Sequence, residues 1–183
     1  MNDPFQEIFR VVTDVLEPAG VDCLLIGGLA VNHYGYSRST LDVDFMIVAD
    51  NRDAVRDAMR QEGFTSMSIL PNVMFFQRPK TVLRVDFLNT DKGTMSKMLE
   101  QAVRSEFFGR NVQLPSLLDL LAMKFFALSQ ASGRRADKDI PDIAWLSLIN
   151  GLDVEADLHS LALRFADEDI FRRVNEKLKE IQA

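Results

Sequence analysis

The spacing of hydrophobic and polar positions changes near residue 114. Up to that point, short apolar runs, several of them alternating with polar residues, are separated by turn residues, which favours β-strands with intervening helices. From Pro115 onward, apolar residues recur every three or four positions, as in amphipathic helices. The pattern predicts an α/β (α+β) fold with a mixed β-sheet and flanking helices over residues 1–114, followed by a C-terminal helical lobe over residues 115–183.

Helix boundaries are indicated by capping residues. Asp3 followed by Pro4 is typical of a helix start, and apolar residues at helical spacing extend this helix to Glu17. A second helix is expected at 51–62, and Asp153 and Asp167 are expected to cap later helices. Beyond the short strand at 23–26, strands are expected at 41–48, 64–70, 73–78 and 81–88.

Two carboxylates one residue apart, Asp42 and Asp44, interrupt an otherwise apolar strand. Side chains alternate faces along a strand, so both acids lie on one face, about 6.6 Å apart. The other face is expected to meet a core, and it consists of Leu41, Val43, Phe45 and Ile47. Asp is depleted in strands, so the pair favours a site for one hard cation, or for two held about 3.5–4 Å apart, over an ordinary solvent-facing edge.

A double glycine, Gly27-Gly28, follows the short apolar strand and precedes a presumed helix. Without Cβ atoms, such a turn allows phosphate to approach backbone N–H groups closely. Taken alone, the glycine pair indicates only a turn.

With Gly27-Gly28, Arg38, Thr40 and Asp42-Val-Asp44 in this order, the chain resembles the polymerase-β-like nucleotidyltransferase superfamily. The family pattern is a Gly-Gly or Gly-Ser turn followed by a strand that bears Asp-x-Asp. The resemblance is strong over residues 24–48 and is nearest to the AbiEii-type toxin branch and related small bacterial nucleotidyltransferases. It implies a nucleotidyltransferase-type sheet for the first lobe.

The family also carries a third carboxylate on a later strand, and Asp86 is the candidate. Alternation in the run 81–88 puts Arg84 and Asp86 on the face opposite the apolar residues, which repeats the geometry of Asp42 and Asp44. The alternative is a surface acid beside Arg84. Asp91, just beyond this strand, is the substitute candidate.

Lys124 lies on the apolar stripe of a predicted helix that begins near Pro115. A lysine in this position either snorkels to the edge of the apolar face or neutralises an anion. The resemblance implies the second role, near the nucleotide phosphates.

The Lys-Asp-x-x-Asp pattern of residues 138, 139 and 142 also recurs in AbiEii-like chains, so Asp139 is a candidate nucleotide-binding residue. The alternative is a helix start, with Asp139 as the N-cap and Asp142 near the third helical position. The preceding Arg134, Arg135 and Lys138 could meet a triphosphate or an anionic acceptor, or form a solvated basic loop.

What the resemblance implies for function is a magnesium-dependent transfer of a nucleoside monophosphate from an NTP to an acceptor hydroxyl. Two Mg2+ ions would be held by Asp42, Asp44 and Asp86. The nucleotide would be bound by Gly27, Gly28, Arg38, Thr40, Lys124 and Asp139. A toxin-like enzyme would modify RNA or protein and have a cognate antitoxin as partner, whereas the alternatives are an antibiotic-type enzyme with a small-molecule acceptor and a noncatalytic binding module of the same fold.

Composition restricts these alternatives only modestly. The chain has 183 residues, of which 47% are hydrophobic and 26% charged, as in an ordinary globular protein. A net charge of −6 argues against a large nonspecific nucleic-acid surface, although not against docking of one RNA end. The sequence contains no run of about 18 apolar residues, the length that a membrane span requires. The N-terminal residues also lack the pattern of a secretory signal, so we expect a cytoplasmic protein. Its one cysteine, Cys23, excludes an internal disulfide.

Overall fold

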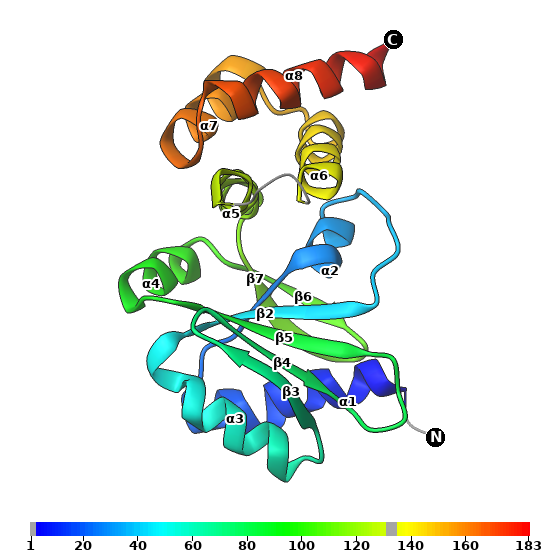
Figure 1. Ribbon diagram of the computed structural model, residues 1–183, viewed down its shortest axis with the longest axis vertical. Helices are drawn as coiled ribbons and strands as arrows, with labels where there is room; N and C mark the ends of the chain where they lie inside the picture. Colours follow the sequence, from blue (N-terminus) through cyan, green and yellow to red (C-terminus); the bar gives the residue numbers. More distant parts are fainter. Residues whose placement is uncertain (1–2, 131–134) are drawn as a thin grey trace. The chain divides into compact units, whose positions relative to one another are not determined.

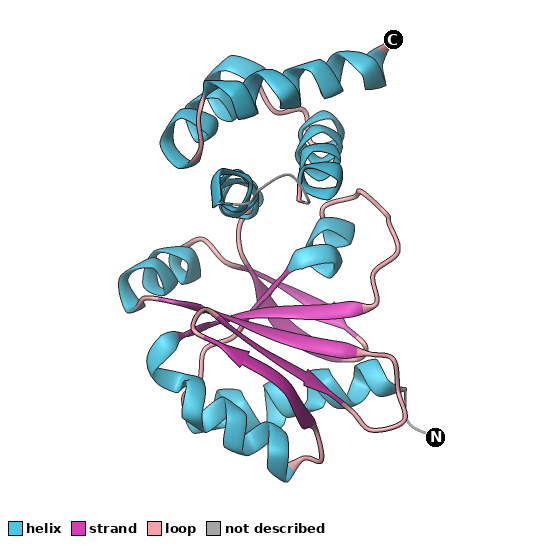
Figure 2. Cartoon of the chain, viewed as in Figure 1, coloured by secondary structure: helices cyan, strands magenta, loops and turns pink. Residues whose placement is uncertain are grey.

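The computed structural model describes residues 3–130 and 135–183, which form two compact units. Unit 1 comprises Met1–Ala30 and Ser39–Ser116, and unit 2 comprises Val31–Arg38 and Leu117–Ala183. Strands are confined to unit 1, and the C-terminal part of unit 2 is helical (Figure 2). By its contacts, the segment Val31–Arg38 belongs to the helical unit, although it lies between two strands in the sequence.

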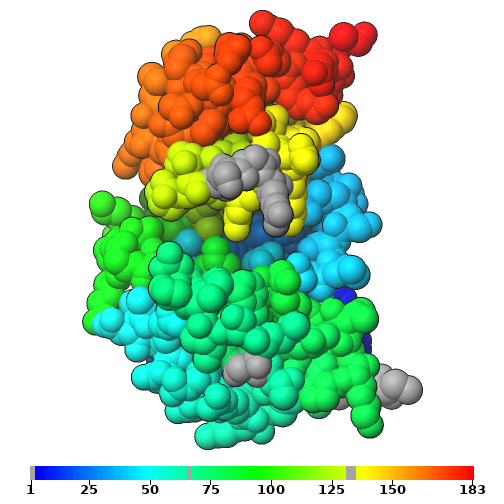
Figure 3. Space-filling model, viewed as in Figure 1, coloured from blue at the N-terminus to red at the C-terminus, as the bar shows by residue number. Residues whose placement is uncertain are grey.

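Unit 1 contains a seven-stranded mixed sheet with the strand order β3-β4-β5-β2-β1-β7-β6. The strands are β1 (Leu24–Ile26), β2 (Asp42–Val48), β3 (Thr65–Leu70), β4 (Val73–Gln77), β5 (Arg84–Thr90), β6 (Val103–Phe107) and β7 (Arg110–Leu114). The central strand β2 pairs parallel with β5 and antiparallel with β1. This arrangement confirms the mixed sheet that the sequence predicts. The edge strand β3 and its neighbour β4 form part of the surface in Figure 3, in shades between cyan and green.

The helices of unit 1 cover the sheet from both sides (Figure 1). They are α1 (Pro4–Val11), α2 (Gly27–His33), α3 (Arg52–Gln61) and α4 (Lys92–Glu100), of which α2 continues into unit 2. Asp3 caps α1 as expected, because its carboxylate accepts a hydrogen bond from Phe5 N at 2.9 Å. A π-helical turn at Val12–Leu16 and a 3-10 turn at Glu17–Ala19 prolong α1, and a 3-10 turn at Ala49–Asn51 precedes α3.

Aromatic side chains fill the core between the sheet and α1. Phe45 of β2 and Phe87 of β5 have ring centroids 5.7 Å apart, and Phe9 of α1 meets Phe45 edge-on at 5.8 Å. All three rings are fully buried. Alternation along the strands therefore fixes the opposite face of β2 and β5 as the one that carries the acids.

In unit 2, the chain beyond Ser116 forms helices α5 (Leu117–Gln130), α6 (Ala136–Ile149), α7 (Ser160–Phe165) and α8 (Glu168–Gln182), with a π-helical turn at Val154–His159. Asp153 and Asp167 cap the π-helical turn and α8, as the sequence predicts. The apolar stripe of α8 is buried at Ile170, Val174 and Leu178. No helix within the described residues is both long and apolar enough to cross a membrane.

Some elements differ from the sequence prediction. Leu41 is 68% exposed, because β2 begins only at Asp42 and strand alternation does not extend to the bend before it. Neither α4 nor the β6–β7 hairpin is predicted by pattern. Only Met95 and Met98 of α4 are buried, and β6 buries none of its residues fully, so neither element has a strong apolar period.

Candidate functional site

Parallel pairing of β2 and β5 brings Asp42, Asp44 and Asp86 to one face of the sheet. Asp44 is the register partner of Asp86, and Asp42 is the partner of Arg84. Partners on neighbouring strands lie about 4.8 Å apart and point to the same side. We call Asp42, Asp44 and Asp86 the acidic triad.

Arg84 joins two members of the acidic triad. Its Nε donates to Asp86 Oδ1 at 2.8 Å, and its Nη2 donates to Asp86 Oδ2 at 3.0 Å and to Asp42 Oδ2 at 2.9 Å. On its other side, the guanidinium lies over the ring of Phe75, 5.2 Å from the ring centroid. The sequence pattern indicates Arg84 only as a neighbour of Asp86. The signal for its role is its position two residues before Asp86, which places both side chains on the same face of the strand.

Burial differs within the triad. The side chain of Asp86 is 6% exposed and that of Asp42 is 36% exposed. Burial raises the pKa of Asp86 to about 6, because the pairing with Arg84 only partly offsets the desolvation, while Asp44 and Asp42 raise this pKa further. Burial alone would lower the pKa of Arg84, but the carboxylates around it raise that pKa instead.

The glycine turn packs directly against the triad. Gly27 has a φ of +66°, and a Cβ atom on it would lie 1.9 Å from Asp44 Oδ2. A Cβ on Gly28 would lie 2.8 Å from Thr40 Oγ1, and this hydroxyl donates to the Asp42 carbonyl oxygen at 3.1 Å. The structure thus brings Gly27, Gly28 and Thr40 together with the triad.

The donor set of the triad fits a hard divalent ion, since Mg2+ prefers carboxylate oxygens. The missing side chain of Gly27 leaves the backbone close to the Asp44 carboxylate. Among the described residues, however, no three acidic, imidazole or thiol groups converge closely enough in this conformation to chelate one ion. Asp42 and Asp86 instead form ion pairs with the guanidinium of Arg84.

The remaining site candidates meet within unit 2. Lys124 Nζ donates to Asp139 Oδ1 at 2.7 Å and to Asp142 Oδ2 at 2.6 Å. Arg38 donates to both oxygens of Asp142, from Nε at 2.7 Å and from Nη2 at 2.8 Å. We call Arg38, Lys124, Asp139 and Asp142 the buried charge cluster, since the last three are at most 7% exposed.

The cluster excludes two of the structural alternatives. The ammonium group of Lys124 is bound between carboxylates inside the unit, so it does not snorkel to an exposed edge. Asp139 and Asp142 are not caps, because α6 begins at Ala136 and both residues lie within it. A helix start at Asp139 would place Pro141 in the first turn, but Pro141 lies in the interior of α6. The substitute candidate Asp91 is itself a cap, since its carboxylate accepts from Thr94 N at 2.9 Å at the start of α4.

The basic loop is only partly described. Arg134 lies outside the described residues, whereas Arg135 is exposed and lies 3.9 Å from Asp139.

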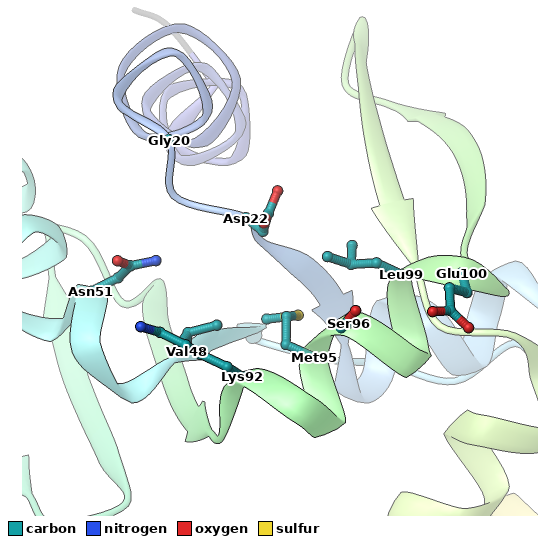
Figure 4. Close-up of a pocket in the computed structure, with 9 residues that line it drawn as sticks. All are labelled: Gly20, Asp22, Val48, Asn51, Lys92, Met95, Ser96, Leu99 and Glu100. Carbon is teal, nitrogen blue, oxygen red and sulfur yellow. The ribbon is translucent and has the colours of Figure 1, made fainter.

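A surface depression of about 610 Å3 lies elsewhere on unit 1 (Figure 4). It is lined by Gly20, Asp22, Val48, Asn51, Lys92, Met95, Ser96, Leu99 and Glu100. Val48 ends β2, so this lining is about 20 Å along the strand from Asp42. The depression is therefore separate from the acidic triad.

Comparison with known families identifies the class of protein. A mixed sheet of this kind with flanking helices is the fold of nucleotidyltransferases. The family described as "Nucleotidyl transferase of unknown function (DUF2204)" matches residues 5–180, so the chain belongs to that family. No protein of curated function has significant sequence similarity to it.

Solved structures share this fold at low sequence identity. The antibiotic-resistance factor ANT(2'')-Ia in complex with adenylyl-2''-tobramycin has a TM-score of 0.66 and 14% identity, covering 86% of this chain and 94% of its own. The lincosamide antibiotic adenylyltransferase LnuA, bound to lincomycin, has a TM-score of 0.57 and 17% identity over 81% of this chain and 99% of its own. An antigenic nucleotidyltransferase-like protein from Paracoccidioides brasiliensis has a TM-score of 0.56 and 20% identity over 95% of this chain and 93% of its own. The predicted fold class is confirmed, and the AbiEii-type branch stays a prediction.

Replacing Gly27 by alanine tests the packing of the turn against the triad. Gly27→Ala forces a left-handed backbone on a residue with a Cβ and also displaces Asp44, for a total cost of roughly 3 kcal/mol or more. Gly63→Ala is the matched control, because Gly63 has a φ of +83° but has nothing within 4 Å of the added Cβ. Urea denaturation should give the control a cost of only about 1–2 kcal/mol. Equal costs for the two variants would contradict the close approach.

The raised pKa of Asp86 predicts a pH-dependent difference between wild type and Asp86→Asn. The protonated carboxyl is favoured in the fold, so its contribution to stability is complete below the ordinary pKa of 3.8 and is lost as the pH rises through about 6. The variant has no such proton. The unfolding free energy of wild type minus that of the variant should therefore fall between about pH 4 and pH 7, measured by denaturation in a chelator. A difference that rises over this range would mean that Arg84 outweighs burial.

Lys124→Met should destabilise the protein strongly. The substitution keeps the apolar volume but removes one of the cations that compensate Asp139 and Asp142, at an expected cost of about 3–5 kcal/mol. Lys92→Met is the control, because Lys92 is exposed and bonds the exposed Asp50. It should change the urea midpoint very little. A Lys124 variant as stable as this control would show that the cluster does not depend on its ammonium group.

Proposed function

We propose that this protein is a magnesium-dependent nucleotidyltransferase that moves a nucleoside monophosphate from an NTP to an acceptor hydroxyl. The observation that carries the proposal is the register of β2 and β5, which aligns Asp44 with Asp86 and puts Asp42 on the same face. The close approach of Gly27 to Asp44 supports it, because it brings an open backbone turn to the same carboxylates. Membership of a nucleotidyl transferase family supports the reaction type.

In this reaction the acceptor oxygen attacks the α-phosphorus, the bond to the bridging oxygen breaks, and pyrophosphate leaves as the acceptor loses its proton. Two Mg2+ ions, when bound, would lower the pKa of the attacking hydroxyl and offset charge on the phosphate oxygens. Asp42 and Asp44 would hold both ions, and Asp86 would hold the ion on the acceptor side. Deprotonated Asp86 is required for this role, so metal binding there is favoured above about pH 6.

For the triphosphate we propose Gly27, Gly28 and Thr40 as the residues that accommodate its β- and γ-phosphates. Arg38 and Lys124 would add positive charge, and Asp139 would orient Lys124, to which it is bonded at 2.7 Å. Within the buried charge cluster these cations already compensate two carboxylates. Their contribution to nucleotide affinity is therefore best measured separately from their contribution to stability.

Two acceptor classes follow from different observations. The run from Ile26 to Asp44 resembles AbiEii-type toxins, which favours an RNA or protein acceptor and a cognate antitoxin. The structural similarity to LnuA with lincomycin and to ANT(2'')-Ia with adenylyl-2''-tobramycin favours a small-molecule acceptor. The net charge of −6 is more compatible with a small molecule or with one RNA end than with a long RNA surface. Each of the four NTPs should be assayed for acceptor-dependent release of pyrophosphate with total RNA, cell extract, a lincosamide and an aminoglycoside.

Asp42→Asn and Asp44→Asn should each reduce transfer by at least about a hundredfold, because a neutral amide is a poor ligand and several kcal/mol of transition-state stabilisation is lost. Asp50→Asn is the control, since Asp50 follows the same strand but is exposed and pairs with Lys92. Both triad variants should stay folded, with a melting temperature in a chelator at or above that of wild type. Full transfer by either variant would exclude the metal mechanism.

Binding supplies a readout that does not require the acceptor. Magnesium with the correct NTP should stabilise wild type by about 2.7 kcal/mol at a hundredfold excess over Kd, and NTP with chelator by far less. This difference should vanish in Asp42→Asn and persist in Asp50→Asn. Equal stabilisation of wild type with and without the metal would exclude binding through the triad.

A further inference from the structure

Arg84 occupies three of the carboxylate oxygens that the acidic triad could offer to a divalent ion. Three hydrogen bonds of 2.8–3.0 Å tie its Nε and Nη2 atoms to both oxygens of Asp86 and to one of Asp42. Mg2+ binds carboxylate oxygens at about 2.0–2.1 Å. An ion that used these oxygens at that distance would lie against the guanidinium, a second cation.

The arrangement of Arg84 is built into the sheet and does not depend on a flexible loop. Arg84 is the register partner of both Asp42 on β2 and Gln77 on β4, and Phe75 is the partner of Asp86. The Phe75 ring supports the guanidinium from the side of β4, with the Cζ atom 5.2 Å from its centroid. The Arg84 side chain is nevertheless 38% exposed, so its guanidinium can rotate away from the carboxylates into solvent.

Charge explains why such a residue is needed. Three carboxylates within one or two strand spacings repel one another. Burial is a further cost in free energy for the ionised form of Asp86. Arg84 is the basic residue that contacts both Asp42 and Asp86 among the ion pairs of the described residues. It therefore compensates the triad in the metal-free protein.

We propose that Arg84 is a resident counter-cation that competes with the divalent ions, so that metal binding releases its guanidinium from Asp42 and Asp86. The proposal rests on the proposed function, because it assumes that the triad binds the metal. The metal affinity is then set by how much more strongly the carboxylates bind the divalent ion than the guanidinium of Arg84. Without metal, the guanidinium still compensates the charge of the carboxylates.

Titration of chelator-stripped protein with Mn2+ alone, followed by calorimetry, tests this competition. Arg84→Met should bind Mn2+ about three- to tenfold more tightly than wild type, the range for the loss of partly exposed ion pairs. Arg84→Lys keeps the positive charge but loses the forked donor geometry of the guanidinium. Its Mn2+ affinity should therefore lie between those of wild type and Arg84→Met.

Arg78→Met is the matched control. Arg78 also lies over a phenylalanine ring, that of Phe64 at 5.5 Å, and also pairs with a carboxylate, that of Glu7 at 2.9 Å. Its side chain is 34% exposed, close to the value for Arg84. Its substitution should leave the Mn2+ affinity unchanged.

Melting temperatures give an independent readout. In a chelator, Arg84→Met should melt below wild type, and saturating Mn2+ should narrow or abolish that difference, because the ion replaces the lost cation. For Arg78→Met, the difference from wild type should be the same with and without Mn2+. If Arg84→Met folds only with Mn2+ present, the competition is supported by that requirement itself.

Equal or weaker Mn2+ binding by both Arg84 variants, with wild type binding Mn2+ and transferring nucleotide, would overturn the competition and leave the proposed function standing. Failure of the proposed function would look different. In that case neither wild type nor Arg84→Met would bind Mn2+, and Asp42→Asn would change nothing.

Discussion

Pairing of two parallel strands, β2 and β5, is the constraint on which the candidate site depends. Their register places Asp44 beside Asp86, while the same alternation buries Phe45 and Phe87 against α1. A shift of one residue in either strand would expose the aromatic rings and bury the acids. The apolar core therefore holds the carboxylates in place, and the energy of that core offsets the repulsion among them.

The chain compensates its carboxylates in two different ways. In unit 1, Arg84 contacts Asp42 and Asp86 with a side chain that is more than one-third exposed, so its ion pairs are exchangeable. In unit 2, Lys124 and Arg38 both form ion pairs with Asp142, whose carboxylate is fully buried. Removal of one partner there leaves a buried charge without full compensation. The first arrangement suits a site that must accept another cation. The second suits a permanent structural contact, and any phosphate contact there has to compete with existing ion pairs.

Strand periodicity was sufficient to predict which face of β2 and β5 bears the acids, because alternation is a local property of the chain. It could not predict that Asp44 and Asp86 are register partners, since about forty residues separate them and the pairing is set by the core. Asp139 was ambiguous for a similar reason. Its partner Lys124 lies on another helix, and the local Asp-x-Pro sequence resembles a helix start. The short helix α4 and the β6–β7 hairpin escaped prediction because few of their residues are buried.

Chain connectivity links the two units through the residues of the candidate site. The glycine turn and Thr40 belong to unit 1, but the segment Val31–Arg38 between them makes its contacts in unit 2. There, Asn32 donates to the Arg38 carbonyl oxygen at 3.0 Å and accepts from Arg38 N at 3.0 Å, which closes the segment into a loop. The Arg38 side chain bonds Asp142, and the ring of Tyr36 stacks on Trp145 of α6. Both ends of this loop therefore continue directly into the residues that we propose to accommodate the triphosphate, and the contacts of the loop with α6 fix where the chain leaves and re-enters unit 1.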